Sequence, residues 1–122
     1  MHSFFNALLN QIFENLLNNA SKYTDKDKTI ELAVEINATS VIVKITDTGI
    51  GITAEALPNV FKMFVQDSHA TRFNGKGLGI GLALVKELVE AHGGMVTANS
   101  DGRGLGSQFT VTLPRQLGDL LQ

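Results

Sequence analysis

Residues 73–94 constrain the fold more than any other part of the chain. They read FNGKGLGIGLALVKELVEAHGG, with glycine at positions 75, 77, 79 and 81 ahead of an apolar helical pattern. Glycines this dense let another molecule approach the bare backbone. A helix that starts near residue 79 offers free N–H groups and the positive end of its dipole. The stretch therefore predicts an anion site at a helix N-terminus, with phosphate as the first candidate.

The two common phosphate motifs do not fit this stretch. A P-loop needs Gly-Lys followed by Ser or Thr, but Lys76 is followed by Gly77. A dinucleotide fingerprint follows a buried strand, whereas residues 66–74 are polar and irregular. We interpret residues 65–74 as a mobile flap that closes over a nucleotide. The alternative is a flexible loop that merely precedes a core helix.

Length and composition predict one domain with its own core. The chain has 122 residues, of which 43% are hydrophobic and 18% charged. A net charge of −2 gives no general attraction to nucleic acid or to an anionic membrane. The absence of cysteine excludes a disulfide framework and a thiolate metal site. No signal peptide and no apolar run of about 18–20 residues is visible, so we expect a cytoplasmic domain.

Hydrophobic periodicity predicts the elements. Apolar residues at helical spacing predict helices at about 4–22 and 79–92, the second ending at Gly93 and Gly94. Alternation of apolar and polar residues predicts strands at about 29–36, 41–47, 95–99 and 107–113. The first strand is expected to be half-buried and to form an antiparallel hairpin with the second. Thr53 is expected to cap a short helix, and residues 58–64 form another short helical segment.

Three polar side chains fall beside the predicted core. Asn15 and Asn19 lie four residues apart on one helix face, with Lys22 close to that face, and a buried amide needs a partner there. By its period of two, Asp47 lies on the core-facing side of its strand, just before the turn that contains Gly49. A buried carboxylate is costly unless it is paired. Asp47 either caps its own backbone turn or accepts a hydrogen bond from a ligand.

Together these pieces resemble the catalytic, ATP-binding domain of sensor histidine kinases, within the GHKL or Bergerat-fold superfamily. The resemblance covers about residues 11–114 and depends on four blocks in the family's order. They resemble the asparagine box at 15–24 (NLLNNASKYT), the first glycine box at 47–51 (DTGIG), the phenylalanine box at 60–64 (VFKMF) and the second glycine box at 75–81 (GKGLGIG). Residues 104–114 resemble the strand that closes the fold.

The resemblance implies an α/β fold of the α+β two-layer sandwich type. A mixed β-sheet would pack against α-helices, and the nucleotide would lie between the helical face of the sheet and a flexible ATP lid. Residues 1–122 would form one catalytic domain without a phosphoacceptor helical domain. The family normally has at least one strand before the asparagine helix, and residues 1–9 stand in its place here. We therefore expect either a sheet that is one or two strands short or an excised fragment.

The resemblance also implies the residues that hold ATP and Mg²⁺. Asn19 matches the magnesium ligand, since an amide carbonyl suits a hard cation already held by phosphate. Asp47 matches the acceptor for the adenine 6-amino group, which would give this buried acid its partner and reject guanine. Further contacts with the nucleotide are implied for Lys22, Tyr23, Gly49, Gly51, Lys76, Gly77, Leu78, Gly79, Gly81 and Ser107.

Asn15 implies which reaction the domain performs. The ATPase branches of the superfamily have a glutamate here that activates water, and an amide cannot act as a base. The resemblance thus implies that Asn15 and Asn19 form the catalytic site of a protein-histidine kinase. The γ-phosphate would pass to a histidine on a separate dimerisation and phosphoacceptor domain, and then to a response regulator. His2, His69 and His92 match no phosphoacceptor motif.

Two other functions remain open at this point. One is a protein-serine kinase acting on an anti-sigma partner. Residues 77–94 argue against it, because their sequence resembles that of histidine kinases. The other is a nucleotide-binding regulatory module without catalysis. In every case we expect no contact with nucleic acid and no direct contact with a membrane, even if the domain is part of a membrane-anchored sensor.

Overall fold

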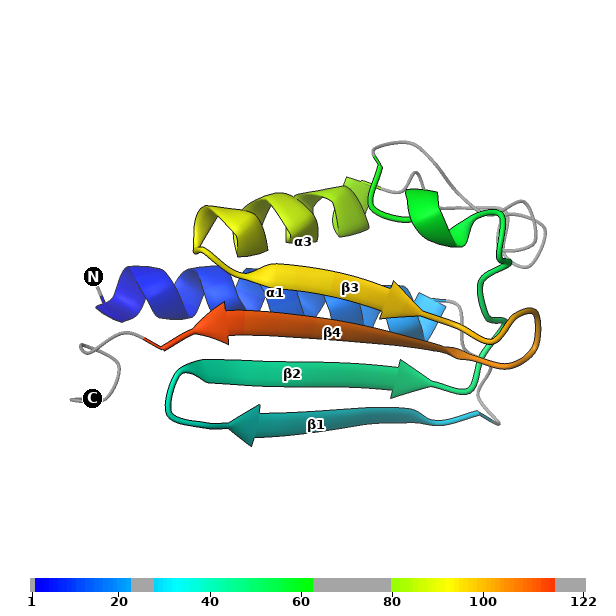
Figure 1. Ribbon diagram of the computed structural model, residues 1–122, viewed down its shortest axis with the longest axis horizontal. Helices are drawn as coiled ribbons and strands as arrows, with labels where there is room; N and C mark the ends of the chain where they lie inside the picture. Colours follow the sequence, from blue (N-terminus) through cyan, green and yellow to red (C-terminus); the bar gives the residue numbers. More distant parts are fainter. Residues whose placement is uncertain (1, 23–27, 63–79, 116–122) are drawn as a thin grey trace.

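The fold is a two-layer α/β sandwich, seen in a computed structural model that describes residues 2–22, 28–62 and 80–115. Two helices lie on one side of a four-stranded sheet (Figure 1). In chain order the elements are α1 (His2–Lys22), β1 (Ile30–Ile36), β2 (Ser40–Asp47), the 3-10 turn η1 (Leu57–Asn59), α3 (Ile80–Ala91), β3 (Met95–Asn99) and β4 (Ser107–Pro114). All predicted strands and both long helices are present, with ends within two residues of the predicted ones. No helix in these described ranges has the length and apolar content that crossing a bilayer requires.

The described sheet is antiparallel throughout, which corrects the mixed sheet that we expected. The strand order is β1-β2-β4-β3, and each of the three adjacent pairs runs antiparallel. β2 and β3 do point the same way, with α3 crossing between them in the chain (Figure 1). They are not neighbours, however, because β4 lies between them and pairs with both. β2 and β3 are therefore parallel in direction but are not hydrogen-bonded to each other.

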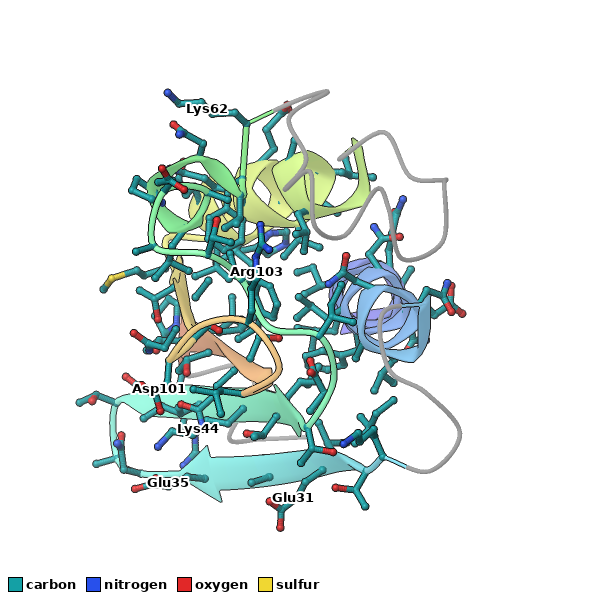
Figure 2. All side chains as sticks on the ribbon, turned by 90° about the vertical axis from the view of Figure 1, so that its right-hand side faces the viewer. Glu31, Glu35, Lys44, Lys62, Asp101 and Arg103 are labelled. Atoms are coloured by element: carbon teal, nitrogen blue, oxygen red, sulfur yellow. The ribbon has the colours of Figure 1, made fainter. Side chains whose placement is uncertain are left out.

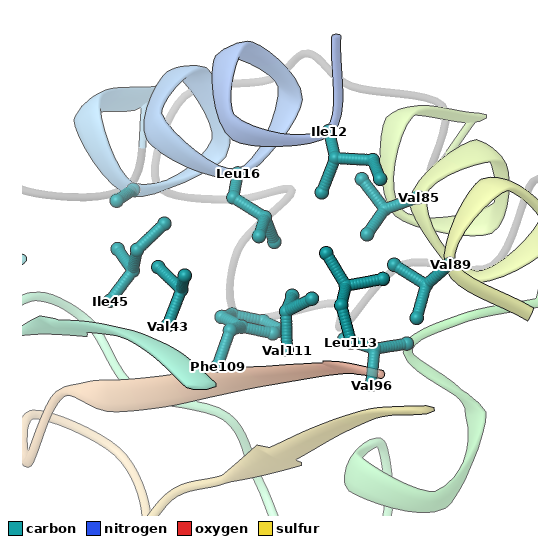
Figure 3. Close-up of a cluster of buried hydrophobic side chains, with 11 residues drawn as sticks. Ile12, Leu16, Val43, Ile45, Val85, Val89, Val96, Phe109, Val111 and Leu113 are labelled. Carbon is teal, nitrogen blue, oxygen red and sulfur yellow. The ribbon is translucent and has the colours of Figure 1, made fainter. Parts of the chain in front are cut away.

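The core lies between the two helices and the strands β2, β4 and β3. Each helix contributes residues one turn apart, such as Ile12 and Leu16 of α1 and Val85 and Val89 of α3 (Figure 3). Full burial of a side chain of this size stabilises the fold by about 1.5–3 kcal/mol. The sheet presents Val43, Ile45, Val96, Phe109, Val111 and Leu113 to the helices. Packing of these side chains against the helices holds β2 and β4 in place, and with them the end of β2 and the start of β4.

β1 is exposed along its whole length, which corrects the half-buried strand that we predicted. Leu32 pairs with Ile45 and Val34 pairs with Val43, so these apolar residues share the helical face of the sheet. Yet Val34 is 56% exposed whereas Val43 is only 2% exposed. The helices cover β2 and β4 and leave β1 open (Figures 1 and 2). Alternation in the sequence predicted which face is apolar but not where the helical layer ends.

Candidate functional site

A buried carboxylate defines the centre of the candidate site. Asp47 is the last residue of β2 and pairs directly with Ser107, the first residue of β4. Its side chain is only 5% exposed. Oδ1 of Asp47 accepts a hydrogen bond from the N–H of Gly49 at 2.9 Å, and Oδ2 accepts one from the hydroxyl of Ser107 at 2.7 Å. The carboxylate is therefore held in one orientation by two donors of the chain itself.

This arrangement corrects one expectation about Asp47. The resemblance implied that a ligand would give the buried acid its partner, but the chain already supplies two partners. The interpretation as a residue that caps its own turn is confirmed by the bond from Gly49. An ionised carboxylate accepts about four hydrogen bonds, so capacity for a further donor remains. Sequence patterns did not reveal the Ser107 bond, since it depends on the register of β2 with β4.

The glycine turn after Asp47 is held in shape by the turn that precedes β4. The N–H of Gly106 donates to the carbonyl of Gly49 at 3.2 Å, and the N–H of Gly104 donates to the carbonyl of Ile50 at 2.7 Å. Two turns that are far apart in sequence thus form one layer beside the carboxylate. The first glycine box is therefore held in shape by hydrogen bonds of the chain itself.

Ser100 joins the same two turns through its side chain. Its hydroxyl accepts a hydrogen bond from the N–H of Ile52 at 2.9 Å and donates to the carbonyl of Gly106 at 2.6 Å. Gly51 lies beside it with φ of 75°, and a Cβ there would collide with the carbonyl of Gly102. The chain's own packing thus requires glycine at position 51. Sequence reasoning missed Ser100, because a serine in a Ser-Asp-Gly turn carries no signal beyond the turn itself.

The two asparagines of α1 are the next of the predicted site residues. Asn15 and Asn19 are both half-buried and lie four residues apart, so they share a helix face. In the described part of the chain, Nδ2 of Asn15 is the one buried side-chain nitrogen or oxygen without a hydrogen-bond partner. Leaving such a donor unpaired costs about 1–3 kcal/mol. A buried donor of this kind calls for a partner, which a water, an ion or a ligand can supply.

The donor set fits magnesium held jointly with phosphate. Within the ranges that the structure describes, no three His, Asp or Glu side chains come together as a metal site. A dedicated all-protein cage is therefore absent from those ranges. Mg²⁺ usually keeps waters and phosphate oxygens and takes only one or two ligands from the protein. The side-chain carbonyl of Asn19 is suited to be such a ligand.

Several predicted site residues are placed only in part or lie outside the described residues. Lys22 is the last residue of α1. Gly81 lies in the first turn of α3, where an added Cβ would meet no atom within 4 Å. The predicted flap at 65–74 lies outside the described residues. The same holds for Tyr23, Lys76, Gly77, Leu78 and Gly79.

The phenylalanine box anchors the segment after the glycine turn to the core. The ring of Phe61 meets the ring of Phe109 edge-on, with centroids 6.0 Å apart and an interplanar angle of 81°. The hydroxyl of Thr53 accepts a hydrogen bond from the N–H of Ala56 at 3.2 Å, as predicted for a cap. The expected short helices are instead a turn followed by η1, and residues 63–64 lie outside the described part. In the sequence, this segment follows β2 and precedes the second glycine box.

Two histidines fall in the described residues: His2 is the first residue of α1, and His92 follows α3 at the end of the sheet opposite to the end of β2 (Figure 1). His92 follows the end of α3, with ring Nδ1 2.9 Å from the carbonyl oxygen of Leu88 in the last turn. This position agrees with the predicted location at a helix C-terminus. This contact indicates a structural role for His92 at the end of α3.

Comparison with known proteins places the chain in a family. The family described as "Histidine kinase-, DNA gyrase B-, and HSP90-like ATPase" matches residues 6–117, and the chain belongs to it. Among individual relatives, the sensor protein KdpD of Clostridium acetobutylicum is 39% identical over 117 residues, which cover 96% of this chain and 13% of KdpD. The chain thus spans about an eighth of that relative's length.

Solved structures agree on the fold. The mycobacterial sensor histidine kinase MprB aligns with a TM-score of 0.79 at 28% identity, over 88% of this chain and 72% of that one. Full-length ShkA, solved in complex with AMPPNP, aligns with a TM-score of 0.72 at 31% identity, over 88% of this chain and 21% of that one. The α/β sandwich that the resemblance implied is confirmed, and the chain is homologous to sensor histidine kinase catalytic domains.

Proposed function

We propose that this chain is the ATP-binding catalytic domain of a two-component sensor histidine kinase. In this function it donates the γ-phosphate of ATP, with Mg²⁺, to a histidine on a separate dimerisation and phosphoacceptor domain. The observation that carries the proposal is the buried Asp47, oriented by Gly49 and Ser107 at the end of the sheet. The family match over residues 6–117 and the AMPPNP complex of ShkA support it.

The Asp47 carboxylate provides recognition of adenine. Its two oxygens are fixed by Gly49 and Ser107, so the remaining lone pairs also have fixed directions. An exocyclic amine is a donor and satisfies one of them. Guanine presents a carbonyl at the corresponding position, which would leave two acceptors facing each other. We therefore assign base selection to Asp47, with Ser107 as the residue that positions it.

Phosphate and metal are assigned to α1 and to the start of α3. Asn19 would hold Mg²⁺ through its carbonyl oxygen, and Lys22 and Tyr23 would lie near the phosphates and the base. Gly81 lies at the positive end of the α3 dipole, and an anion can approach its backbone because no Cβ intervenes. Lys76, Gly77, Leu78 and Gly79 would complete the lid. Catalysis is then positioning plus neutralisation of charge, as phosphoryl transfer requires.

Asn15 determines what receives the phosphoryl group. An amide cannot remove a proton from water, so hydrolysis lacks its base on this chain. The base and the accepting histidine would both come from the phosphoacceptor domain, and a response regulator would act downstream. KdpD is far longer than the matched region, which leaves room for such a domain in proteins of this kind. We place residues 1–122 as one catalytic domain that functions in the cytoplasm, without contacting a membrane or nucleic acid.

The test is a transfer assay with ATP labelled at the γ-phosphate. The chain is incubated alone, then with a separately made histidine-bearing domain of its own system, and then with that domain and Asn19→Ala. We expect label on the histidine domain only in the second mixture, at a low rate because the reactants are no longer tethered. Rapid hydrolysis by the chain alone would move it to the ATPase branch. Nucleotide binding and docking without transfer would indicate a regulatory module.

A further inference from the structure

The side chain of Ser100 uses its full hydrogen-bonding capacity on three backbone groups. Its hydroxyl accepts from the N–H of Ile52 at 2.9 Å and from the N–H of Gly102 at 3.2 Å, and it donates to the carbonyl of Gly106 at 2.6 Å. A hydroxyl has one proton to donate and two lone pairs with which to accept. No capacity therefore remains for a ligand, and any part that Ser100 plays in binding is indirect.

The bond to Gly106 determines where Ser107 lies. The N–H of Gly106 donates to the carbonyl of Gly49 at 3.2 Å, while its carbonyl accepts from Ser100. The peptide unit between Gly106 and Ser107 is planar, so a carbonyl held in place also holds the Cα of Ser107. Ser107 in turn donates to Oδ2 of Asp47 at 2.7 Å. A continuous path of covalent and hydrogen bonds thus leads from Ser100 to the buried carboxylate.

The bond from Ile52 holds the glycine turn that follows β2. A Cβ at Gly51, the residue before it, would collide with the carbonyl of Gly102. Figure 2 looks onto this end of the sheet, where Asp101 of the turn between β3 and β4 is labelled. The two turns meet through bare backbone, and the hydroxyl of Ser100 bonds to both of them. Ser100 therefore sets the distance between the glycine turn and the start of β4.

We propose that Ser100 is a positioning residue for nucleotide binding, which acts through Ser107. By holding the start of β4 against the glycine turn, it places the hydroxyl of Ser107 on Asp47 and orients the carboxylate toward the adenine 6-amino group. The inference rests on the proposed function, in which Asp47 selects the base. It assigns an effect on affinity to a side chain whose hydrogen bonds all go to the chain itself.

The opposite end of the sheet supplies a matched control. Oδ1 of Asn37, in the turn between β1 and β2, accepts from the N–H and the hydroxyl of Thr39 at 2.9 Å and 3.2 Å, and from the N–H of Ser40 at 2.8 Å. Ser100 and Asn37 thus each brace a turn by several hydrogen bonds, but the turn of Asn37 lies at the far end of β2 from Asp47 (Figure 1). Asn37→Ala therefore removes comparable bonds without disturbing the carboxylate.

The first test compares Ser100→Ala, Asn37→Ala and the unaltered chain by calorimetry with ATP and Mg²⁺. We expect ATP affinity to fall about tenfold in Ser100→Ala, which corresponds to the loss of one hydrogen bond, and to stay unchanged in Asn37→Ala. Urea unfolding shows that each variant is folded under the conditions of the titration. Without nucleotide, amide hydrogen exchange at Ile52 and Gly102 should be faster in Ser100→Ala than in the other two proteins.

A second measurement needs no substitution at Ser100. Coupling between two equilibria is reciprocal, so a bond that favours ATP binding must itself be favoured by ATP. In the unaltered chain, ATP with Mg²⁺ should slow hydrogen exchange at the amides of Ile52 and Gly102. The amides of Thr39 and Ser40, which Asn37 holds at the other end of the sheet, should not change. This comparison decides the question even if Ser100→Ala does not fold.

A double variant distinguishes positioning from an independent contribution. If Ser100 acts through Ser107, then Ser100→Ala should cost little once Ser107→Ala has already removed the hydroxyl that bonds to Asp47. The double variant should then bind ATP within about twofold of Ser107→Ala alone, whereas independent effects would multiply.

Four results would overturn the proposal. They are unchanged ATP affinity in Ser100→Ala, an equal loss in Asn37→Ala, multiplied losses in the double variant, and exchange at Ile52 and Gly102 that does not respond to ATP. Failure of the unaltered chain to bind ATP would be a different outcome, because it would refute the proposed function itself and this inference with it.

Discussion

The hydroxyl of Ser107 donates a 2.7 Å hydrogen bond to Oδ2 of Asp47, across 60 positions of sequence. This bond joins the first residue of β4 to the last residue of β2. Together with the N–H of Gly49 on Oδ1, it orients the carboxylate through groups of the chain itself. A group that is already oriented loses less conformational freedom when it binds. The sheet register is therefore part of the proposed recognition of adenine.

Removal of this hydroxyl should weaken both the fold and the site. Ser107→Ala leaves Asp47 buried with one donor fewer, and a hydrogen bond to a charged group contributes about 1.5–3 kcal/mol. We expect the free energy of unfolding in urea to fall by that amount at most, and ATP affinity to fall as well. Ser107→Thr retains the hydroxyl and is the matched control. Equal losses in the two variants would show that the hydroxyl is not responsible.

Asp47 itself should decide the choice of base. Asp47→Asn removes the charge and replaces one acceptor oxygen with a donor nitrogen. If the carboxylate accepts from adenine, the loss of about 1.5–3 kcal/mol corresponds to roughly 10- to 150-fold weaker ATP binding. Calorimetry with ATP and GTP measures both affinity and preference. Indistinguishable affinity of the unaltered chain for the two nucleotides would contradict the assignment.

Local patterns in the sequence predicted Asp47 well but could not reveal its partner. A period of two was sufficient to place its side chain on the core-facing side of β2, and Gly49, two residues further on, indicated a turn. The bond from Ser107 depends on β4 lying next to β2. The packing of the whole sheet decides which strand lies next to β2, and a local sequence pattern carries no information about it. Ser100 is hidden for the same reason, because it joins two separate turns.

The exposure of β1 is a second feature that local sequence patterns could not predict. Alternation between Leu32 and Ala33 gives the apolar face of the strand, but burial depends on what covers that face. The helices α1 and α3 cover the apolar face of β2, β4 and β3, and this helical layer does not extend over β1 (Figure 1). The width of a helical layer follows from the number of helices and their spacing, which no single strand encodes. The resemblance, by contrast, predicted the fold class correctly, because four motifs in order specify a whole architecture.

Two glycine-to-alanine substitutions should have opposite effects on stability. Gly51→Ala places a Cβ against the carbonyl of Gly102 at a φ of 75°, and a strained backbone position of this kind costs about 1–3 kcal/mol before the collision is counted. Gly81→Ala meets open space in a helix, where alanine is favoured by roughly 0.5–1 kcal/mol. Urea unfolding of both variants measures the contrast.

Gly81→Ala should also lower the affinity for ATP. If phosphate approaches the backbone at Gly81, a methyl group there obstructs it, and Gly81→Ala should bind ATP more weakly although it folds more stably. The size of the loss is measured by calorimetry on the folded variant. An alanine variant that gains stability and retains full ATP affinity would remove Gly81 from the proposed phosphate site.

Asn19 should act through the metal rather than through the nucleotide alone. Asn19→Ala removes the only carbonyl that we assign to Mg²⁺, so affinity for ATP with Mg²⁺ should fall while affinity in EDTA changes little. The control is Asn18→Ala, since Asn18 is exposed on the same helix. Titrations of both variants with and without metal test the assignment. A constant ratio between the two conditions in Asn19→Ala would exclude this role.

Asn15 should show a conflict between stability and activity. Its Nδ2 is buried without a partner among the residues that the structure describes, and an unsatisfied donor costs about 1–3 kcal/mol. Asn15→Leu replaces the amide with an apolar group of similar size, so the folded chain should become more stable by up to that amount. The transfer of phosphate to the histidine domain should fall sharply at the same time, since a group retained at such a cost is typical of a functional site.

The control for this substitution is Asn18→Leu, which changes an exposed position of the same helix. It should alter neither transfer nor the free energy of unfolding by more than about 0.5 kcal/mol. Urea unfolding and the labelled transfer assay are measured on both variants, with ATP affinity determined alongside. A stabilised Asn15→Leu that still transfers phosphate at the full rate would show that the amide plays no part in the reaction. A destabilised one would show that Nδ2 has a partner in the folded chain, and the amide would then be structural.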